Sequence, residues 1–337
     1  MIVLYGASGY TGSLVAGQLV AAGARPVLAG RRRAALEEVA RPLGLEVRVG
    51  GLETPPLEGA DILLNCAGPF AVTQPPLLRA SIARGIHYLD LAGEVDEHLS
   101  AAAADPAART AGSLVMPGIG FGIIPSDGLL ASVVSRLPDA TYAELSLKTV
   151  GTPSRGTTEV VLGSLRRPGV HRRGGILRPR RSGARTTRID FADGDGPTTV
   201  TTNPWRGDLA SSVPGVADLD ASMAMPAPLR ALMHVPHGSL LRRMARRMPD
   251  GPTEEQRAAG RTAIHVRAEN AADRVASAVL LGPDAYTFTA HLAAAAAVRI
   301  SELSAGGLVP SGHRLPSEVF GADFALNTPG VRRVKLH

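Results

Sequence analysis

The stretch Gly6-Ala7-Ser8-Gly9-Tyr10-Thr11-Gly12 joins an apolar run at 2–7, which predicts a buried strand, to a helical pattern at 11–22. Three glycines at this spacing between a strand and a helix are typical of a dinucleotide-binding turn. The first permits the tight turn, the second lets backbone approach a pyrophosphate, and the third lets the helix pack on the strand. The free amides and dipole of the helix start favour an anion. We therefore expect cofactor contacts from Gly6, Ser8, Gly9, Tyr10, Thr11 and Gly12.

The end of the second predicted strand, at 26–30, indicates which dinucleotide binds. Gly30 is followed by Arg31, Arg32 and Arg33, and no carboxylate stands where an NAD-specific site would accept from the ribose hydroxyls. Arg31 and Arg32 offer guanidinium groups suited to a 2′-phosphate, and one could stack on the adenine. The expected cofactor is NADP(H). The alternative is that these arginines only begin a solvent-facing helix.

Strands and helices alternate through about residue 115, which predicts a doubly wound parallel sheet of the Rossmann type. The expected strands are 2–7, 26–30, 45–50, 61–67, 87–91 and 113–117, and the expected helices are 11–22, 33–41, 75–84 and 96–111. Beyond about 120, alternating segments predict a second, mixed α/β (α+β) domain with a mixed or antiparallel sheet. Its expected strands are 144–150, 186–191, 198–202, 262–268 and 275–281, with long loops at 166–184 and 204–228.

The predicted domains are an NADP-binding domain at 1–120 and a substrate or dimerisation domain at 121–294. A C-terminal segment at about 295–337 is expected to pack back on the first domain. Parallel sheets bind ligands beyond the carboxyl ends of their strands. The loop after the fourth strand is therefore expected beside the nicotinamide ribose, together with Gly93 after the fifth strand. That loop consists of Cys66, Ala67, Gly68, Pro69 and Phe70.

Several kinds of chemistry are excluded by residue types and spacing. Glu144 and Val331 stand four residues before the two lysines, Lys148 and Lys335, so the Tyr-Lys pair of short-chain reductases is absent. The single cysteine, Cys66, excludes internal disulfides and multi-cysteine zinc sites, and its position in the first domain argues against an acyl-enzyme. There is no Gly-x-Ser-x-Gly elbow, and no histidine pair has metal-ligand spacing with a carboxylate. Hydride transfer by a bound cofactor remains.

Candidate catalytic and substrate residues follow from position. Tyr88 and Asp90 end the fifth strand and are candidate proton donors, with packing under the sheet as the alternative for Tyr88. Phe121 follows the sixth strand and is expected near the substrate. Arg155 and Thr157 stand near the start of a second-domain helix, where they could hold an anionic or carbonyl oxygen, or Thr157 could simply cap the helix.

These residues together resemble the saccharopine dehydrogenase-like family, and within it the short bacterial branch that includes mycobacterial trans-acting enoyl reductases. The first-domain motifs are GASGYTG at 6–12, AGR at 29–31, NCAGPF at 65–70, GIHYLDLAGE at 85–94 and GFGIIPSD at 120–127. The later motifs are GPTEEQR at 251–257, GPDAYTFTAHLA at 282–293 and GGLVPSGHRLPS at 306–317. Two positions depart from the family pattern. Gly122 and Ile123 replace an Asp-Ser pair, and Arg155 is inserted between Ser154 and Gly156.

The resemblance implies a Rossmann domain, a mixed second domain, NADP(H) and, for the enoyl reductase branch, reduction of a conjugated C=C bond in a lipid or polyketide chain. We expect an NADPH-dependent reductase of an enone or enoyl group on an apolar biosynthetic substrate that is carrier- or CoA-linked. The alternatives are a C=N reductase of the saccharopine dehydrogenase type and an NADP(H)-binding sensor or scaffold without turnover.

Composition and charge bear on partners and location. The net charge is +6, and nine arginines with no acid stand between Arg166 and Arg188. Aromatics are 4% of the chain and do not interleave with the arginines, which argues against nucleic acid. A solvated face or a surface for an anionic partner remains. No apolar run reaches the roughly 18 residues of a membrane span, and no signal peptide precedes the first strand, so a cytoplasmic location is expected.

One amphipathic stretch, residues 238–248, suggests a further contact. Its apolar and basic residues fall on opposite helical faces. Core packing or a homodimer contact is expected, and the alternatives are a lid over an apolar substrate and peripheral docking on a membrane surface.

Overall fold

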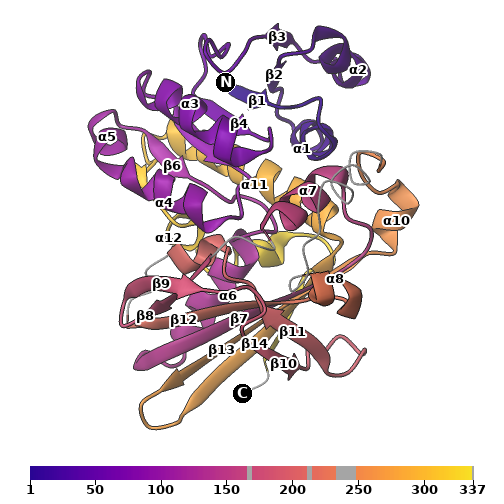
Figure 1. Cartoon of the computed structure of the whole chain (residues 1–337). Helices are drawn as coiled ribbons and strands as arrows, with labels where there is room; N and C mark the ends of the chain where they lie inside the picture. The colour runs from indigo at the N-terminus through magenta and orange to yellow at the C-terminus, as the bar shows by residue number, and fades with distance from the viewer. Residues whose placement is uncertain (165–168, 211–214, 233–247, 336–337) are drawn as a thin grey trace. The chain divides into compact units, whose positions relative to one another are not determined.

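The computed structural model describes residues 1–164, 169–210, 215–232 and 248–335. The chain forms two compact units (Figure 1). The first comprises Met1–Ile124 and Tyr286–Phe320, and the second comprises Pro125–Ala285 and Gly321–His337. The amphipathic segment expected at 238–248 lies outside the described residues except for Met248, as do Arg166 and Arg167 of the arginine run.

The first unit contains a parallel sheet of seven strands in the order β15-β6-β5-β4-β1-β2-β3. Its strands are β1 (Ile2–Tyr5), β2 (Val27–Gly30), β3 (Val47–Val49), β4 (Ile62–Asn65), β5 (His87–Asp90), β6 (Leu114–Met116) and β15 (Gly312–His313). Every pair is parallel. The order reverses between β1 and β4, which is the point where doubly wound sheets bind their ligands. The predicted Rossmann sheet is confirmed.

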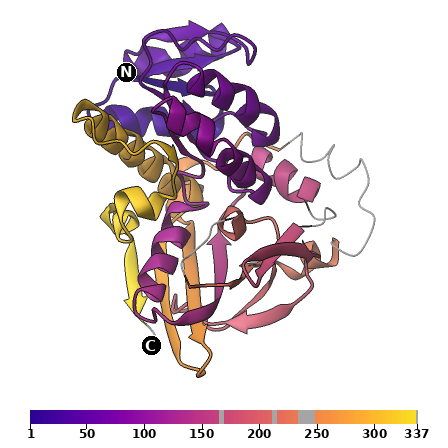
Figure 2. The same ribbon diagram turned by 90° about the vertical axis from the view of Figure 1, so that its left-hand side faces the viewer.

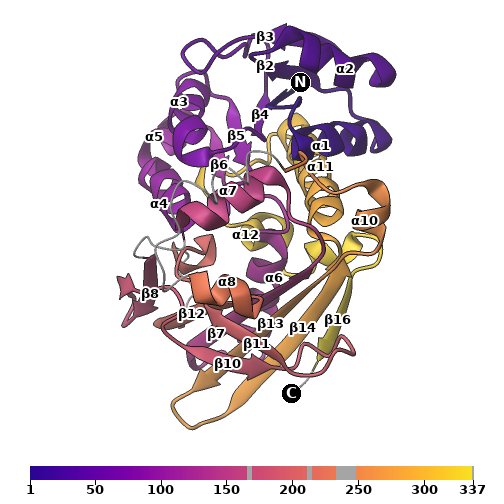
Figure 3. The ribbon, with the colours of Figure 1, turned by 45° about the vertical axis from the view of Figure 1, so that its right-hand side comes forward.

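Helices flank this sheet on both sides. They are α1 (Tyr10–Ala21), α2 (Arg33–Leu43), α3 (Phe70–Ile82), α4 (Val95–Ala103) and α5 (Asp105–Thr110). Figure 3 shows α1 and α2 on one side of the sheet and α3 to α5 on the other. Right-handed crossovers that run in opposite directions from the switch point produce this arrangement. Because both faces are covered, β1, β2 and β4 are buried along their whole length.

Two helix predictions differ from the structure, and proline is involved in both. Helix α3 begins at Phe70, before Pro75 and Pro76, which lie inside it. The single helix expected at 96–111 is divided into α4 and α5 at Ala104, next to Pro106. Proline has no amide hydrogen to continue a helical ladder, so it favours a new helix start at this place.

The C-terminal segment, drawn from gold to yellow in Figure 2, returns to the first unit earlier than expected. It contributes α11 (Ala285–Ala305), β15 and α12 (Pro316–Phe320). The amide of His313 donates to Asp105 at 2.8 Å beside the β15–β6 pair. The remainder does not return to the first unit. Strand β16 (Arg332–Lys335) pairs antiparallel with β14 (Val275–Pro283) and forms the edge of the second sheet.

The second unit contains a mixed sheet in the order β10-β11-β12-β7-β13-β14-β16. The further strands are β7 (Ala140–Val150), β8 (Gly169–Arg173), β9 (Ile176–Arg180), β10 (Thr186–Ile189), β11 (Thr198–Thr202), β12 (Asp218–Ala224) and β13 (Arg261–Asn270). Strands β12 and β7 are parallel, and the other neighbours are antiparallel. Its helices are α6 (Ile124–Val134), α7 (Arg155–Ser164), α8 (Ala227–Leu232) and α10 (Glu254–Ala258), with short 3₁₀ turns at η1 (Gly207–Ala210) and η2 (Phe324–Asn327). The predicted mixed second domain is confirmed.

The prediction of long loops at 166–184 and 204–228 was wrong. The first range contains β8 and β9, and the second contains β12. Strands β8 and β9 form a hairpin whose turn uses Gly174 and Gly175, both at positive φ. Strand β12 lies in the middle of the sheet. The many arginines of this region made it look like an exposed loop. In the structure, however, the Arg172 side chain on β8 is buried, and its guanidinium donates to the carbonyls of Leu209 and Ala210 at 2.9 Å.

Among the described residues, no helix combines the length and the apolar character needed to cross a bilayer. Nor do three metal-ligating side chains from those residues gather into a group that could hold a metal ion.

Candidate functional site

The glycine turn after β1 has a geometry that only glycine satisfies at two positions. Gly6 has φ +85°, and a Cβ there would lie 2.6 Å from the amide nitrogen of Ala67. A Cβ on Gly12 would lie 2.3 Å from the carbonyl oxygen of Gly6. The β1–α1 turn therefore packs directly against the loop after β4 and against the first turn of its own helix. These are the close approaches expected of a dinucleotide-binding turn.

The start of α1 is open to a ligand. Gly9 is the N-cap of this helix and is exposed. A Cβ added to Gly9 would meet only the carbonyl oxygen of Gly6, at 3.3 Å, in the described part of the chain. Within the described residues, no side chain caps this helix and no acid stands in its first turn. Ser8, Tyr10 and Thr11 are partly exposed around it. The first-turn amides and the helix dipole can therefore hold a pyrophosphate.

Arg31 and Arg32 follow β2 immediately and are exposed. In the part of the chain that the structure describes, neither forms an ion pair, whereas Arg33 lies 3.6 Å from Glu37. Burial raises the pKa of Tyr5 at the end of β1, and the positive charge of Arg31 opposes this rise. Arg31 is therefore close enough to the end of β1 to act on Tyr5. Two unpaired guanidinium groups thus stand at the carboxyl end of the first two strands.

The loop after β4 runs beside the glycine turn. The amide of Cys66 donates to the carbonyl of Tyr5 at 2.8 Å, and the amide of Ala67 donates to Asn65 Oδ1 at 2.9 Å. Gly68 and Pro69 are exposed, their peptide bond is cis, and Phe70 begins α3. Burial raises the pKa of the Cys66 thiol, so it stays protonated. Cys66 is thus a small buried residue of this loop.

Tyr88 and Asp90 lie beneath these loops, where neither side chain is exposed. The Tyr88 hydroxyl donates to Asp90 Oδ2 at 2.9 Å, and Gln74 Nε2 donates to the same oxygen at 2.9 Å. The other oxygen accepts from the amides of Ala92 at 2.9 Å and Gly118 at 3.1 Å. One buried carboxylate therefore ties together the loops after β5 and β6.

The same network reaches the loop after β4. Asn65 Nδ2 donates to the Tyr88 hydroxyl at 3.1 Å, and Thr73 Oγ1 donates to the Ala67 carbonyl at 2.5 Å. Burial and the negative charge of Asp90 raise the pKa of Tyr88 well above its usual range. A buried hydroxyl that already donates to a carboxylate is suited to position the loops. The proton-donor role of Tyr88 and Asp90 stays a prediction.

A further buried carboxyl, in the helix that follows β5, was not singled out from the sequence. Glu97, in the first turn of α4, is 8% exposed, and its Oε2 has no hydrogen-bond partner among the described residues. Burial and the negative charge of Glu94 raise the pKa of Glu97 to about 7. Glu94 itself accepts from the amide of Gly93 at 3.0 Å. An acid in the first turn after β5 was a signal that sequence reasoning could have used.

An aromatic group joins the start of α1 to the returning helix α11. The rings of Tyr10 and Tyr286 meet edge to face with centroids 5.2 Å apart, and those of Phe121 and Phe288 lie 5.7 Å apart. The amide of Phe121 donates to Thr289 Oγ1 at 3.2 Å. Tyr286 and Thr289 were missed because only folding brings Tyr286 to Tyr10 and Thr289 to Phe121, which lies 168 positions away from Thr289.

Arg155 and Thr157 belong to the second unit. The guanidinium of Arg155 forms an ion pair with Asp250. Ser154 Oγ accepts from the amide of Thr157 at 3.2 Å, so Ser154 caps α7 while Thr157 lies in its first turn. The structure thus gathers the expected cofactor residues within the first unit, and these two expected substrate residues lie in the second.

Comparison with known proteins gives two sequence relatives and a shared fold, while no family model matches the chain. It is 37% identical over 94 residues to the probable mitochondrial saccharopine dehydrogenase-like oxidoreductase of Arabidopsis thaliana, covering 26% of this chain and 20% of that protein. It is 34% identical over 163 residues to the trans-acting enoyl reductase of Mycobacterium leprae, covering 43% of this chain and 38% of that protein. Each match thus spans less than two fifths of the relative's length.

The fold has a counterpart among solved structures. Apo saccharopine dehydrogenase (L-Glu forming) from Saccharomyces cerevisiae superposes with a TM-score of 0.65 at 12% identity, covering 100% of this chain and 99% of that one. Parts of the chain are thus similar in sequence to a saccharopine dehydrogenase-like oxidoreductase and to a trans-acting enoyl reductase, and its fold is that of saccharopine dehydrogenase.

Proposed function

We propose that this protein is an NADPH-dependent reductase that transfers a hydride to an activated C=C bond, an enone or enoyl group, of an apolar, carrier- or CoA-linked biosynthetic substrate. The observation that carries the cofactor choice is the pair Arg31 and Arg32 at the end of β2, exposed and without ion pairs among the described residues. They stand where a carboxylate would accept from the ribose of NAD.

The residues of the first unit divide the binding of the dinucleotide between them. The first-turn amides of α1 hold the pyrophosphate, and Arg31 and Arg32 bind the 2′-phosphate through charge-assisted hydrogen bonds. Cys66 to Phe70 and Gly93 shape the nicotinamide end. When bound, NADPH supplies the hydride, and the protein supplies position and electrostatics.

Asp90 is proposed to keep the loops after β5 and β6 in place for that transfer, because it accepts from the amides of both. Tyr88 holds the loop after β4 through Asn65. The proton that completes the reduction comes from Tyr88 or from water, and water is favoured because the Tyr88 hydroxyl already donates to Asp90. Phe121 and Thr157 remain the proposed substrate contacts.

Reduction of C=C is favoured by the 34% identity over 163 residues to the trans-acting enoyl reductase of Mycobacterium leprae. A C=N reductase of the saccharopine dehydrogenase type would need a cation for a substrate carboxylate. Arg155, the candidate for that role, is already paired with Asp250. A sensor without turnover is the remaining alternative.

The cofactor assignment is tested by titrating NADPH and NADH into the wild type and two variants. Arg31→Ala should weaken NADPH by about 1–3 kcal/mol, or roughly 5- to 150-fold, and leave NADH nearly unchanged. Arg33→Ala is the matched control, because Arg33 pairs with Glu37 in the same segment. Equal affinity of the wild type for the two nucleotides would refute the assignment.

The reaction is tested by following NADPH oxidation over a panel of enones, enoyl thioesters and cyclic imines. Turnover of enones or enoyl thioesters is the expected result. Turnover of imines alone would replace the C=C assignment, and tight NADPH binding with silence across the panel would favour the sensor.

A further inference from the structure

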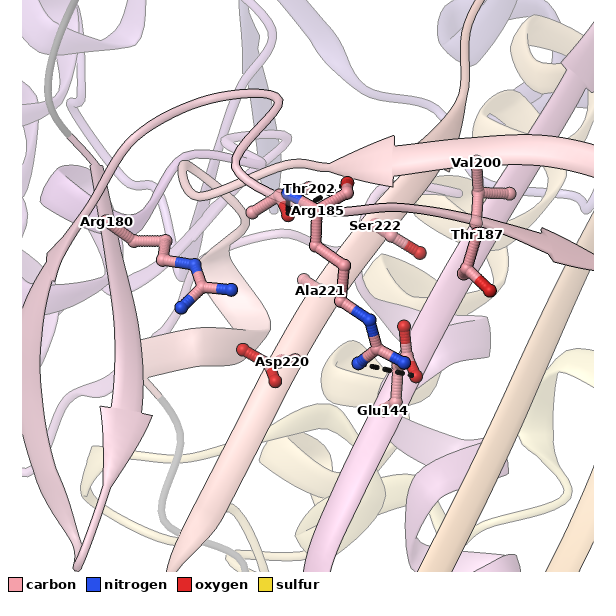
Figure 4. A pocket seen from close by; sticks show the side chains of 9 residues that line it. All are labelled: Glu144, Arg180, Arg185, Thr187, Val200, Thr202, Asp220, Ala221 and Ser222. Carbon is pink, nitrogen blue, oxygen red and sulfur yellow. Dashed lines mark hydrogen bonds and ion pairs between the residues drawn. The ribbon is translucent and has the colours of Figure 1, made fainter.

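A second site candidate lies wholly within the second unit and shares no residue with the proposed cofactor site. A small, solvent-open pocket is lined by residues on or next to β7, β9, β10, β11 and β12 (Figure 4). The charged residues that line it are Arg180, Arg185, Glu144 and Asp220. The Thr187 hydroxyl is one of the neutral polar groups that line it. From the sequence, Arg180 and Asp220 were expected in the loops at 166–184 and 204–228, whereas Glu144 and Thr187 were expected in strands.

Both carboxylates of the pocket already have cationic partners. Arg185 Nη1 lies 3.9 Å from Glu144 Oε2. Asp220 pairs with Arg173 and accepts from the Tyr142 hydroxyl at 3.2 Å. The acids of the pocket are therefore balanced within the protein.

Arg180 differs from the other charged residues of the pocket in its partners. Among the described residues it has no ion pair, and its Nε is shielded from water without a hydrogen-bond acceptor. Figure 4 shows its guanidinium turned toward the pocket on the side of Asp220. Its charge reaches the neighbouring His171, whose pKa is lowered by burial and by the charges of Arg173 and Arg180. A shielded donor without an acceptor is costly, so the pocket favours a ligand that supplies one.

The shape of the Arg180 guanidinium limits the chemical class of ligand that the pocket can bind. A guanidinium offers a planar fork that matches the two oxygens of a carboxylate or a phosphate. Thr187 Oγ1, which has no hydrogen-bond partner in the described part of the chain, adds a further donor to the same pocket.

We propose that this pocket binds one small oxyanion group, a carboxylate or a phosphate, through the Arg180 guanidinium and the Thr187 hydroxyl. The proposal does not depend on the reductase activity, because every residue it uses lies in the second unit.

The test is calorimetric titration of the purified full chain with inorganic phosphate and with acetate, at an ionic strength held constant with sodium chloride. Saturable binding of either anion is expected, and the anion that binds identifies the source of the oxyanion. Arg180→Gln should weaken that binding at least tenfold. The matched control is Arg178→Gln, which removes one charge from an exposed position of the same strand and should change the affinity less than twofold.

A measurement on the wild type keeps the proposal testable if Arg180→Gln does not fold. Modification of arginines by phenylglyoxal, read by mass spectrometry, should slow at Arg180 when the binding anion is present and stay unchanged at Arg178. The proposal is overturned if neither anion binds saturably, if both variants lose affinity equally, or if the anion protects both arginines alike.

Discussion

A pair of alanine substitutions in α1 isolates the close packing on which the glycine turn depends. Gly12→Ala places a Cβ 2.3 Å from the Gly6 carbonyl oxygen and 2.9 Å from the Ala7 Cα, both of which are backbone atoms. Gly17→Ala, five positions later in the same helix, meets nothing within 4 Å. The two variants make the same chemical change in the same helix and differ in the space available.

The magnitudes follow from helix propensity and steric overlap. Replacing an interior glycine by alanine stabilises a helix by about 0.8–1.0 kcal/mol, so Gly17→Ala should raise the free energy of unfolding by that amount. Gly12→Ala has the same gain, but the overlap with backbone forces a shift that costs about 1–3 kcal/mol. The difference between the variants measures the overlap alone, since the propensity contribution cancels.

Urea denaturation followed by circular dichroism gives the two free energies, and NADPH titration gives the effect on the site. Gly12→Ala should also weaken NADPH by roughly tenfold or more, equivalent to about 1.4 kcal/mol, because the helix start moves away from the turn. Gly17→Ala should bind like the wild type. Equal stability of the two variants would show that the turn is not packed as the structure has it.

Two further substitutions test buried charges. The folded pKa of Glu97, about 7, lies above its ordinary 4.5, so its ionisation removes stability as pH rises through this window. At 1.36 kcal/mol per pKa unit the loss is at most about 3 kcal/mol. Glu97→Gln should therefore flatten the decline in urea midpoint between pH 5 and 8, and an unchanged slope would contradict this. Lys148→Met should cost about 3–5 kcal/mol, because Lys148 Nζ lies 2.6 Å from the buried carboxylate of Asp193. Adding Asp193→Leu should recover part of that loss in the same assay, and no recovery would argue against the pair.

Much of the first unit could be predicted because its signals are local. The strand before Gly6, the helix after Gly12 and the basic residues after β2 follow from neighbours in sequence and from steric limits on the backbone. The second unit was harder. Strands β8, β9 and β12 were read as loops, because arginines on β8 find their carbonyl and carboxylate partners only after the chain folds.

The candidate site likewise contains residues that the sequence indicates locally and residues that only folding brings together. Its proposed cofactor residues were predicted from one spacing of glycines and one absent carboxylate. The part played by Asp90 could not be found, since its four hydrogen-bond partners come from Gln74, Tyr88, Ala92 and Gly118. Tyr286 was missed for the same reason, because its contact with Tyr10 joins segments from opposite ends of the chain.

What the amino-acid order determined by itself was the nucleotide-binding turn and the parallel sheet behind it, because positive φ, helix starts and alternating burial are properties of short segments. Folding alone decided which carboxylate would hold the loops, which aromatic rings would meet and which of the described arginines would have no ion pair. Those outcomes depend on hydrogen bonds, charges and close packing between residues that are far apart in sequence.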